Sequence, residues 1–146
     1  MARLNGFTKK QLIDVYSLMV SARELDNKML ILLKQGKGFF HMGCSGHEAA
    51  QIAAGLTFKK EEDWSYPYYR DGAYVLGLGL NSRQQLLSFL ARADDPCSGG
   101  RQMPMHYSKE DLRIFKSFRM DLSKKFPSND PIFCPFTVII NDSFFL

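Results

Sequence analysis

The chain has 146 residues, of which 45% are hydrophobic and 13% aromatic, so it is long enough for one domain with a packed core. This composition excludes a disordered polypeptide, because aromatic residues are plentiful and no long block of one charge occurs. The net charge of +4 is spread along the chain, whereas nucleic-acid-binding proteins usually concentrate basic residues on one face. We therefore expect no nucleic-acid partner.

The three cysteines, Cys44, Cys97 and Cys134, are too few and too far apart for a disulfide framework, which favours a reducing, cytoplasmic setting. They form no Cys-x-x-Cys pair, so neither zinc nor a redox dithiol is indicated. Residues 1–10 are polar and lack the apolar core of a signal peptide. No stretch reaches the roughly 18 apolar residues that a membrane-spanning helix needs. We expect a soluble protein without a membrane partner.

A long helix is predicted first, with Thr8 at its start, Gln11 as the capping-box partner and glycines at 36 and 38 beyond its end. Apolar residues recur every three or four positions and predict one buried face: Val15, Leu18, Ala22, Leu25, Met29 and Leu32. A second apolar row widens this face and predicts deep packing: Leu12, Tyr16 and Met19.

Cap signals, glycines and prolines predict the later elements. In chain order these are a helix over residues 49–56, an extended segment over 64–71, a short helix over 72–80, a helix from 82 to about 92, and a loop over 94–104. Ser45 with Glu48, and Ser82 with Gln85, are the expected capping boxes of two of these helices.

The last third of the chain differs in composition. All 11 glycines lie at or before Gly100, no alanine follows Ala93, and seven of the 12 phenylalanines lie between Phe115 and Phe145. Residues 136–140 are compatible with one strand, but no alternation of helices and strands surrounds them. No linker in this region is sharp enough to define a second domain.

The pair Tyr69-Arg70 is a candidate binding site for a phosphate group. The planar fork of donors in arginine suits phosphate oxygens, and a tyrosine hydroxyl adds one more hydrogen bond. The alternative is a structural role, in which Arg70 forms an ion pair with Asp71 beside a core tyrosine.

The segment Gly99 to Tyr107 is a second candidate. Its glycines allow the backbone to approach a ligand, and Arg101 and His106 can meet an anion or carry a proton. An ordinary glycine turn with a structurally hydrogen-bonded histidine explains the same residues.

Two weaker patterns remain. His41 and His47 flank Cys44, which suggests zinc ligands, but no fourth ligand follows at a familiar spacing, so we expect no metal site. The residues Gly77-Leu78-Gly79 lack the preceding strand and third glycine of a dinucleotide-binding fingerprint.

Taken together, the sequence resembles the N-terminal part of the alpha subunits of thiamine-diphosphate-dependent 2-oxo-acid dehydrogenases, of pyruvate or branched-chain type. Four motifs in the same order carry the resemblance: Leu18-Met19-Val20-Ser21-Ala22-Arg23-Glu24-Leu25-Asp26, Gly46-His47-Glu48-Ala49-Ala50, Tyr66-Pro67-Tyr68-Tyr69-Arg70-Asp71, and Gly100-Arg101-Gln102-Met103-Pro104-Met105-His106-Tyr107. The segment from Asp94 to Gly100 is similar to bacterial forms in which the alpha and beta halves are fused.

The resemblance implies an oxidoreductase that decarboxylates a 2-oxo acid and passes the acyl group to a lipoyl group on a partner acyltransferase. It implies thiamine diphosphate as cofactor, with Tyr69 and Arg70 on its diphosphate and His106 near the active-site channel. His41 lies where some relatives carry a histidine. The implied partners are the beta subunit, or beta half, and the lipoyl-bearing acyltransferase.

Against this family we expect two parts: residues 1–114 as its N-terminal helical part, and a divergent or out-of-frame tail over 115–146. The tail lacks the family's Ser-Ser-Pro-like loop and the Gly-Asp-Gly motif that binds magnesium. We therefore expect only the mainly helical N-terminal portion of the α/β thiamine-diphosphate-binding fold, with apolar surface exposed and no activity of its own. The alternative function is a non-catalytic fragment that only binds other subunits.

Overall fold

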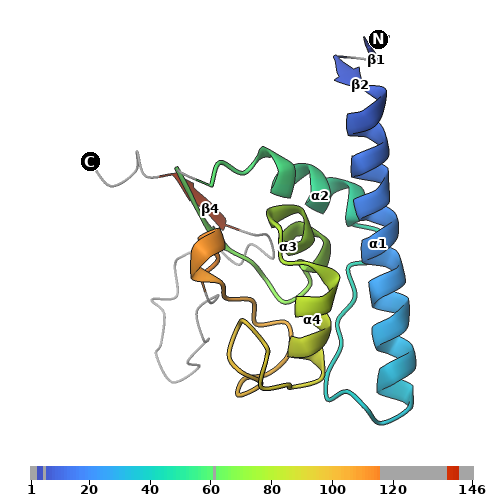
Figure 1. Ribbon diagram of the computed structural model, residues 1–146, viewed down its shortest axis with the longest axis vertical. Helices are drawn as coiled ribbons and strands as arrows, with labels where there is room; N and C mark the ends of the chain where they lie inside the picture. Colours follow the sequence, from blue (N-terminus) through green and yellow to red (C-terminus); the bar gives the residue numbers. More distant parts are fainter. Residues whose placement is uncertain (1–2, 5, 61, 116–137, 142–146) are drawn as a thin grey trace, which may run out of the picture.

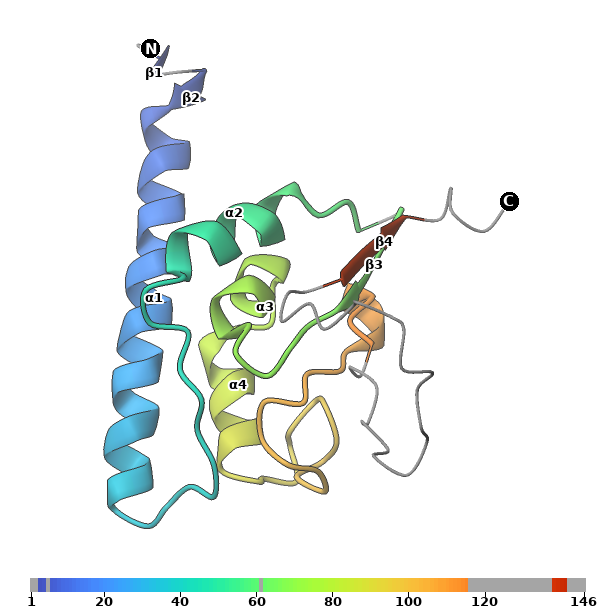
Figure 2. The ribbon, with the colours of Figure 1, turned by 180° about the vertical axis from the view of Figure 1, so that it is seen from behind.

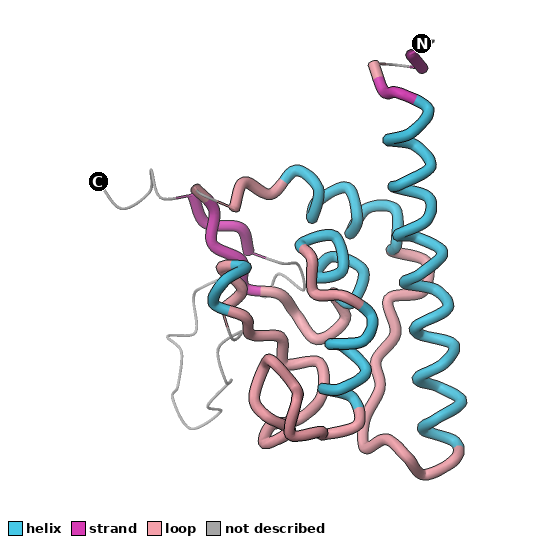
Figure 3. The backbone as a smooth tube through the Cα atoms, viewed as in Figure 1, coloured by secondary structure: helices cyan, strands magenta, loops and turns pink. Residues whose placement is uncertain are grey.

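The computed structural model describes residues 3–4, 6–60, 62–115 and 138–141. This part of the chain is partly helical, with four α-helices and few strands, and its elements are drawn in Figures 1 and 3. In chain order they are β1 (Arg3–Leu4), β2 (Phe7–Thr8), α1 (Lys9–Lys34), α2 (Glu48–Thr57), β3 (Asp63–Tyr66), α3 (Gly72–Leu78), α4 (Ser82–Phe89), a 3-10 helix (Glu110–Leu112) and β4 (Val138–Asn141).

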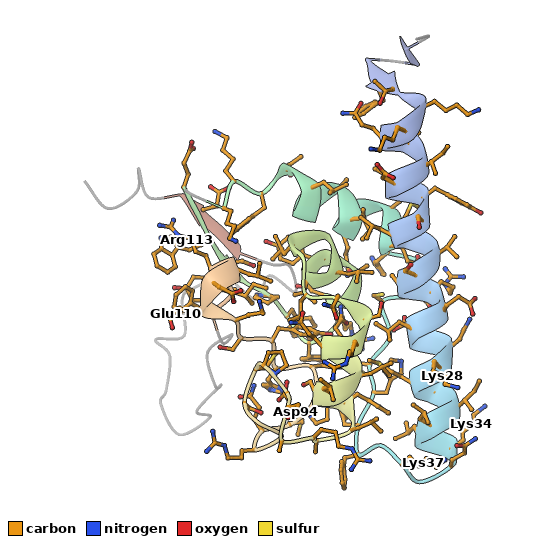
Figure 4. All side chains as sticks on the ribbon, viewed as in Figure 1. Lys28, Lys34, Lys37, Asp94, Glu110 and Arg113 are labelled. Atoms are coloured by element: carbon orange, nitrogen blue, oxygen red, sulfur yellow. The ribbon has the colours of Figure 1, made fainter. Side chains whose placement is uncertain are left out.

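The long helix α1 begins and ends as the sequence predicts. Thr8 accepts a hydrogen bond from the Gln11 N–H and the Gln11 side chain accepts one from the Thr8 N–H, so the capping box is present. Gly36 follows the last turn with φ of 68°, a conformation that favours glycine. Lys34 lies in the last turn, where its positive charge complements the negative end of the helix dipole (Figure 4).

Helix α3 takes part in both hydrophobic clusters of the described chain. Tyr74 and Val75 belong to the larger cluster, and Ala73 and Leu76 belong to the smaller one. The other helices contribute the following buried side chains: Ala22, Leu25 and Met29 from α1, Ile52 from α2 and Phe89 from α4. The C-terminal half of α1 therefore packs on the predicted face.

The prediction that a second apolar row buries α1 deeply is wrong for Leu12 and Tyr16, although Met19 is partly buried against the smaller cluster. Leu12 is 38% exposed, Ile13 is 55% exposed and Tyr16 is 67% exposed. The reason is that the first turns of α1 extend beyond α2, away from the other described helices (Figures 1 and 2). The expected exposure of apolar surface is thus confirmed. None of the described helices is long and apolar enough to cross a membrane.

The short strands form two antiparallel pairs. Strand β1 pairs with β2, and β3 pairs with β4 in a register that sets Ser65 opposite Ile139. The other edge of β3 binds the backbone around Ile114, since Ser65 N–H donates to Arg113 at 3.0 Å and Phe115 N–H donates to Ser65 at 2.8 Å. Strand β4 covers residues 138–140 of the predicted strand and extends to Asn141, while residues 136 and 137 lie outside the described part. The α/β fold with a parallel sheet remains a prediction.

Two of the predicted capping boxes are wrong. His47, not Ser45, precedes α2. The Ser45 hydroxyl donates to the buried Asp26 instead, because the Asp26 carboxylate also binds the N–H of the neighbouring Cys44 and so lies close to Ser45. Asn81 with Gln84, one residue earlier than predicted, forms the capping box of α4. The predicted helix over 72–80 ends at Leu78, and the helix expected to reach about residue 92 ends at Phe89.

Helices α2 and α3 meet at two glycines. A Cβ atom placed on Gly55 would lie 2.7 Å from the carbonyl oxygen of Tyr74, and one on Gly77 would lie 3.2 Å from the Cα of Gly55. Both obstacles are backbone atoms, which cannot rotate away. The closeness of α2 to α3 therefore requires the absence of side chains at both positions.

We predict that Gly55→Ala destabilises the fold by about 1–3 kcal/mol, because the methyl group forces α2 away from α3. Helix propensity alone would give the opposite sign, a gain of about 1 kcal/mol for alanine over glycine. Urea unfolding followed by circular dichroism measures the difference. Ala53→Gly, at an exposed position of the same helix, reports the propensity effect. A more stable Gly55→Ala protein would contradict the close contact.

Candidate functional site

The loop between α1 and α2 is fixed by two buried carboxylates. Asp26 on α1 accepts a hydrogen bond from the Cys44 N–H at 2.7 Å. Glu48 accepts hydrogen bonds from Arg23 and from the Gly46 N–H, and the hydrogen bond from Arg23 lowers the pKa of Glu48. These contacts hold the first family-like motif, on α1, against the second, at the start of α2.

The predicted anion-binding pair lies in the turn between β3 and α3. Tyr69 is half-buried, with its ring against the edge of Phe40 at 6.4 Å between centroids. Arg70 is exposed, and its guanidinium carbon lies 5.8 Å from the centre of the Tyr69 ring. The pKa of the Tyr68 hydroxyl is raised, mainly by a hydrogen bond with Tyr69, whereas Arg70 acts to lower this pKa. The polar ends of these three side chains thus lie close together.

The alternative ion pair between Arg70 and Asp71 is not formed. Asp71 is buried, and its Oδ2 accepts a hydrogen bond from the Tyr68 N–H at 2.7 Å. Its Oδ1 accepts from Gln51 Nε2 at 3.3 Å. Among the described residues, no carboxylate lies within 4.0 Å of the Arg70 guanidinium. Asp71 therefore shapes the turn, and the guanidinium is accessible to an anion.

The glycine-containing loop over residues 94–104 is organised by Asp95. Its buried carboxylate accepts hydrogen bonds from the N–H groups of Cys97, Ser98 and Gly100. Gly100 has φ of 72°, and a Cβ there would lie 2.5 Å from the carbonyl oxygen of Ala91, so the position requires glycine. The predicted loop is confirmed as a tight structural turn.

His106 follows this loop and is half-buried. Its Nδ1 lies 3.2 Å from the carbonyl oxygen of Pro104, and its own carbonyl accepts from Gln102 Nε2. A proton on Nδ1 satisfies the contact with Pro104 and leaves Nε2 as the acceptor nitrogen. A purely structural role for His106 therefore explains the position of Nδ1 but not that of Nε2.

Three segments that are distant in sequence meet at Gly72. A Cβ atom on Gly72 would lie 3.4 Å from the Tyr107 hydroxyl and 3.8 Å from the Cys44 sulfur. Met105 accepts a hydrogen bond from the Met42 N–H at 3.2 Å. The loop after α1, the Tyr69-Arg70 turn and the His106 segment therefore border one another. The Cys44 thiol and the Tyr107 hydroxyl thus both lie next to Gly72.

The His41, Cys44 and His47 pattern does not form a metal centre in the described chain. Both ring nitrogens of His41 are buried without a hydrogen-bond partner, and Nε2 lies 3.6 Å from Asp26 Oδ1. Burial raises the pKa of the Cys44 thiol to about 12, whereas His47 is exposed. Within the described residues, no three His, Cys, Asp or Glu side chains are grouped as metal ligands.

The sequence model of the Dehydrogenase E1 component family matches residues 16–120, more than half of the chain. The chain belongs to this family. The matched region contains all three segments that meet at Gly72, so the E1 family sequence and the candidate site coincide.

Among curated relatives, the alpha subunit of 2-oxoisovalerate dehydrogenase from Bacillus subtilis is 41% identical over 109 residues, which are 75% of this chain and 33% of the relative. The pyruvate dehydrogenase E1 component subunit alpha of Mycoplasma genitalium is 39% identical over 80 residues, which are 55% of this chain and 22% of the relative. The chain thus spans about a third, or less, of the length of these E1 relatives.

Sequence reasoning missed Gln51 and the structural roles of Asp26 and Asp95. The Gln51 side chain binds backbone 19 to 23 residues further along the chain. No local spacing rule reports such contacts, because they exist only after α2 and α3 have packed. Asp95 is different, since an aspartate shortly before a Ser-Gly-Gly sequence is a turn signal that local analysis can use.

We predict that His41 makes the fold less stable in mild acid. Burial lowers the pKa of His41, although Asp26 opposes this shift, so the folded protein binds the proton less readily than the unfolded chain does. Stability is therefore lost as the pH falls through the ordinary histidine value of about 6.5. Urea unfolding at pH 7.5 and pH 5.5 measures this loss.

The variant His41→Leu should lose less stability between these two pH values than the natural chain. His47→Gln, at an exposed histidine, is the matched control and should behave like the natural chain. An equal pH dependence in His41→Leu and the natural chain would show that His41 does not cause it.

Proposed function

We propose that this chain supplies the diphosphate-binding turn of a 2-oxo-acid dehydrogenase that uses thiamine diphosphate. One observation carries the proposal: the exposed Arg70 guanidinium lies beside two tyrosine hydroxyls and has no carboxylate within 4.0 Å among the described residues. The E1 family is thiamine-diphosphate-dependent in general, which supports a diphosphate as the anion that such a turn would bind.

The residues present fit the diphosphate part of this cofactor. An arginine can donate two parallel hydrogen bonds to phosphate oxygens, and these charge-assisted bonds are stronger than neutral ones. The Tyr68 and Tyr69 hydroxyls can add donors at the same surface. When bound, thiamine diphosphate supplies the decarboxylation chemistry, while the protein holds and orients it.

His106 would take a second role beside the cofactor, as a group that holds or moves a proton. Its Nδ1 contact with Pro104 leaves Nε2 as an acceptor nitrogen that can take a proton. Its segment borders the Tyr69-Arg70 turn at Gly72. The magnesium ion that accompanies the cofactor would need ligands from residues outside the four family-like motifs.

The remaining parts of the active site would come from partners. We infer that a beta subunit, or beta half, completes the cofactor site and that a lipoyl-bearing acyltransferase receives the acyl group. The exposed apolar side chains of α1, including Ile13 and Tyr16, provide a surface for subunit contact. The substrate would be a 2-oxo acid, as the names of the B. subtilis and M. genitalium relatives indicate for those proteins.

The second candidate function is a non-catalytic fragment that binds other subunits. Two observations favour it: the tail from residue 115 onward contains no glycine and hence no Gly-Asp-Gly motif, and α1 exposes several large apolar side chains. The two candidates differ in ligand binding, because only the first requires an affinity for diphosphate.

We predict that thiamine diphosphate and inorganic pyrophosphate, each with magnesium, bind this chain and shift the NMR signals of Tyr68, Tyr69 and Arg70. Arg70→Ala should weaken this binding roughly tenfold to hundredfold, because it removes charge-assisted hydrogen bonds. Arg70→Lys should restore only part of the affinity, since an ammonium group cannot make the two-pronged contact. NMR titration detects millimolar affinities, which suits an incomplete site.

Both arginine variants should melt at the temperature of the natural chain, because Asp71 and Gln51, not Arg70, hold the turn. Lys37→Ala, at another exposed basic residue, is the control for a general effect of charge. Equal affinities in the natural chain and Arg70→Ala would remove Arg70 from the site. No binding of either ligand by the natural chain would favour the subunit-binding fragment.

A further inference from the structure

Gln51 connects α2 to the turn that carries Arg70. The side chain is half-buried, and its Nε2 donates to the Arg70 carbonyl oxygen at 3.1 Å and to Asp71 Oδ1 at 3.3 Å. Its Oε1 accepts from the N–H groups of Ala73 at 3.2 Å and Tyr74 at 3.4 Å. Both ends of the Gln51 amide thus bind the short segment from Arg70 to Tyr74, through its backbone and through the Asp71 carboxylate.

The two ends of the amide have different tasks. The first N–H groups of a helix have no partner within the helix, and a side chain just before the helix usually accepts from them. Asp71 occupies that position before α3 but makes no such cap hydrogen bond. Gln51 Oε1 accepts from the second and third residues of α3 instead, so the cap comes from another helix.

Because Gln51 caps α3 in place of Asp71, the Asp71 carboxylate can bind the turn that precedes the helix. Asp71 Oδ2 accepts from the Tyr68 N–H at 2.7 Å, which closes the turn over Tyr68, Tyr69 and Arg70. Gln51 Nε2 then holds both the Asp71 carboxylate and the Arg70 carbonyl. The backbone on both sides of the Arg70 side chain is therefore fixed by Gln51, directly or through Asp71.

We propose that Gln51 is a positioning residue for diphosphate binding: it caps α3 in place of Asp71 and thereby fixes the backbone from which Tyr69 and Arg70 reach the anion. This inference rests on the proposed diphosphate role of Tyr69 and Arg70. Gln51 itself does not contact the anion. Its effect is to reduce the freedom that the Arg70 side chain would lose on binding.

The test compares Gln51→Met, which keeps the length and neutrality of the side chain but none of its hydrogen bonds, with Tyr74→Phe. The control removes a buried hydrogen bond of α3, between Tyr74 and Ser65 at 2.9 Å, and leaves the Tyr68–Asp71 turn intact. Two quantities are measured on the full chain: amide hydrogen exchange at residues 68–74 and the affinity for inorganic pyrophosphate by NMR titration.

We expect Gln51→Met to speed amide exchange at Tyr68, Ala73 and Tyr74, and to weaken pyrophosphate binding about threefold to tenfold, as the loss of one or two net hydrogen bonds would. Tyr74→Phe should lower the melting temperature but leave the pyrophosphate affinity unchanged. Gln51→Ala, tested in the same way, should reproduce the lower affinity if the methionine variant folds poorly.

The outcomes separate the two proposals. If Arg70→Ala loses affinity but Gln51→Met and Gln51→Ala keep that of the natural chain, the positioning role is wrong and the diphosphate site stands. If Tyr74→Phe loses affinity to the same extent as Gln51→Met, the effect is general destabilisation and the positioning role is also wrong. If the natural chain does not bind pyrophosphate, the proposed function fails, and the role of Gln51 fails with it.

Discussion

The close contact of α2 with α3 is the constraint on which the candidate site depends. Gly55 and Gly77 lack the Cβ atoms that would separate the two helices, and the backbone atoms at this contact have no freedom to move aside. Only at this separation can a side chain of α2 reach the first turn of α3. Gln51 uses that reach to bind Arg70, Asp71, Ala73 and Tyr74.

A second set of contacts attaches the long helix to this unit. Asp26 and Glu48 are buried carboxylates whose acceptor oxygens bind the loop between α1 and α2. A buried charge is costly unless hydrogen bonds compensate it, so both acids restrict the loop to one conformation. His41 lies in the same loop with no hydrogen bond to either ring nitrogen, which makes it the least satisfied buried side chain among the described residues.

These contacts explain how the described part of this E1-family chain holds an organised turn, although its described strands form only two-stranded sheets. The turn at Tyr68 to Asp71 is held by the Asp71 and Gln51 side chains, which both lie within the matched region. The first turns of α1, by contrast, expose large apolar side chains and gain little from the rest of the described fold. Exposed apolar side chains of this kind are what the subunit contact proposed above requires.

Local patterns in the sequence predicted much of the helical structure. The start of α1 follows from Thr8 and Gln11, and the loop around Gly100 follows from its glycines, because both signals act over a few residues. The family resemblance also came from local motifs, and it is confirmed over residues 16–120. The error at Ser82 arose because Asn81 beside it is also a cap residue, and local signals cannot choose between them. The error at Ser45 has another cause, since its hydroxyl donates to Asp26 on α1, a contact that local signals do not report.

Other features were decided by tertiary structure alone. Apolar spacing marked Leu12 and Tyr16 as buried, but a helix face is buried only where another element covers it, and none of the described helices lies beside those turns. Adjacent charges suggested a pair between Arg70 and Asp71, but backbone geometry turned Asp71 inward and left Arg70 exposed. The sequence by itself determined which residues were candidates for the site, because residue type fixes chemistry. Packing decided which way they face, since that depends on contacts between residues far apart in the chain.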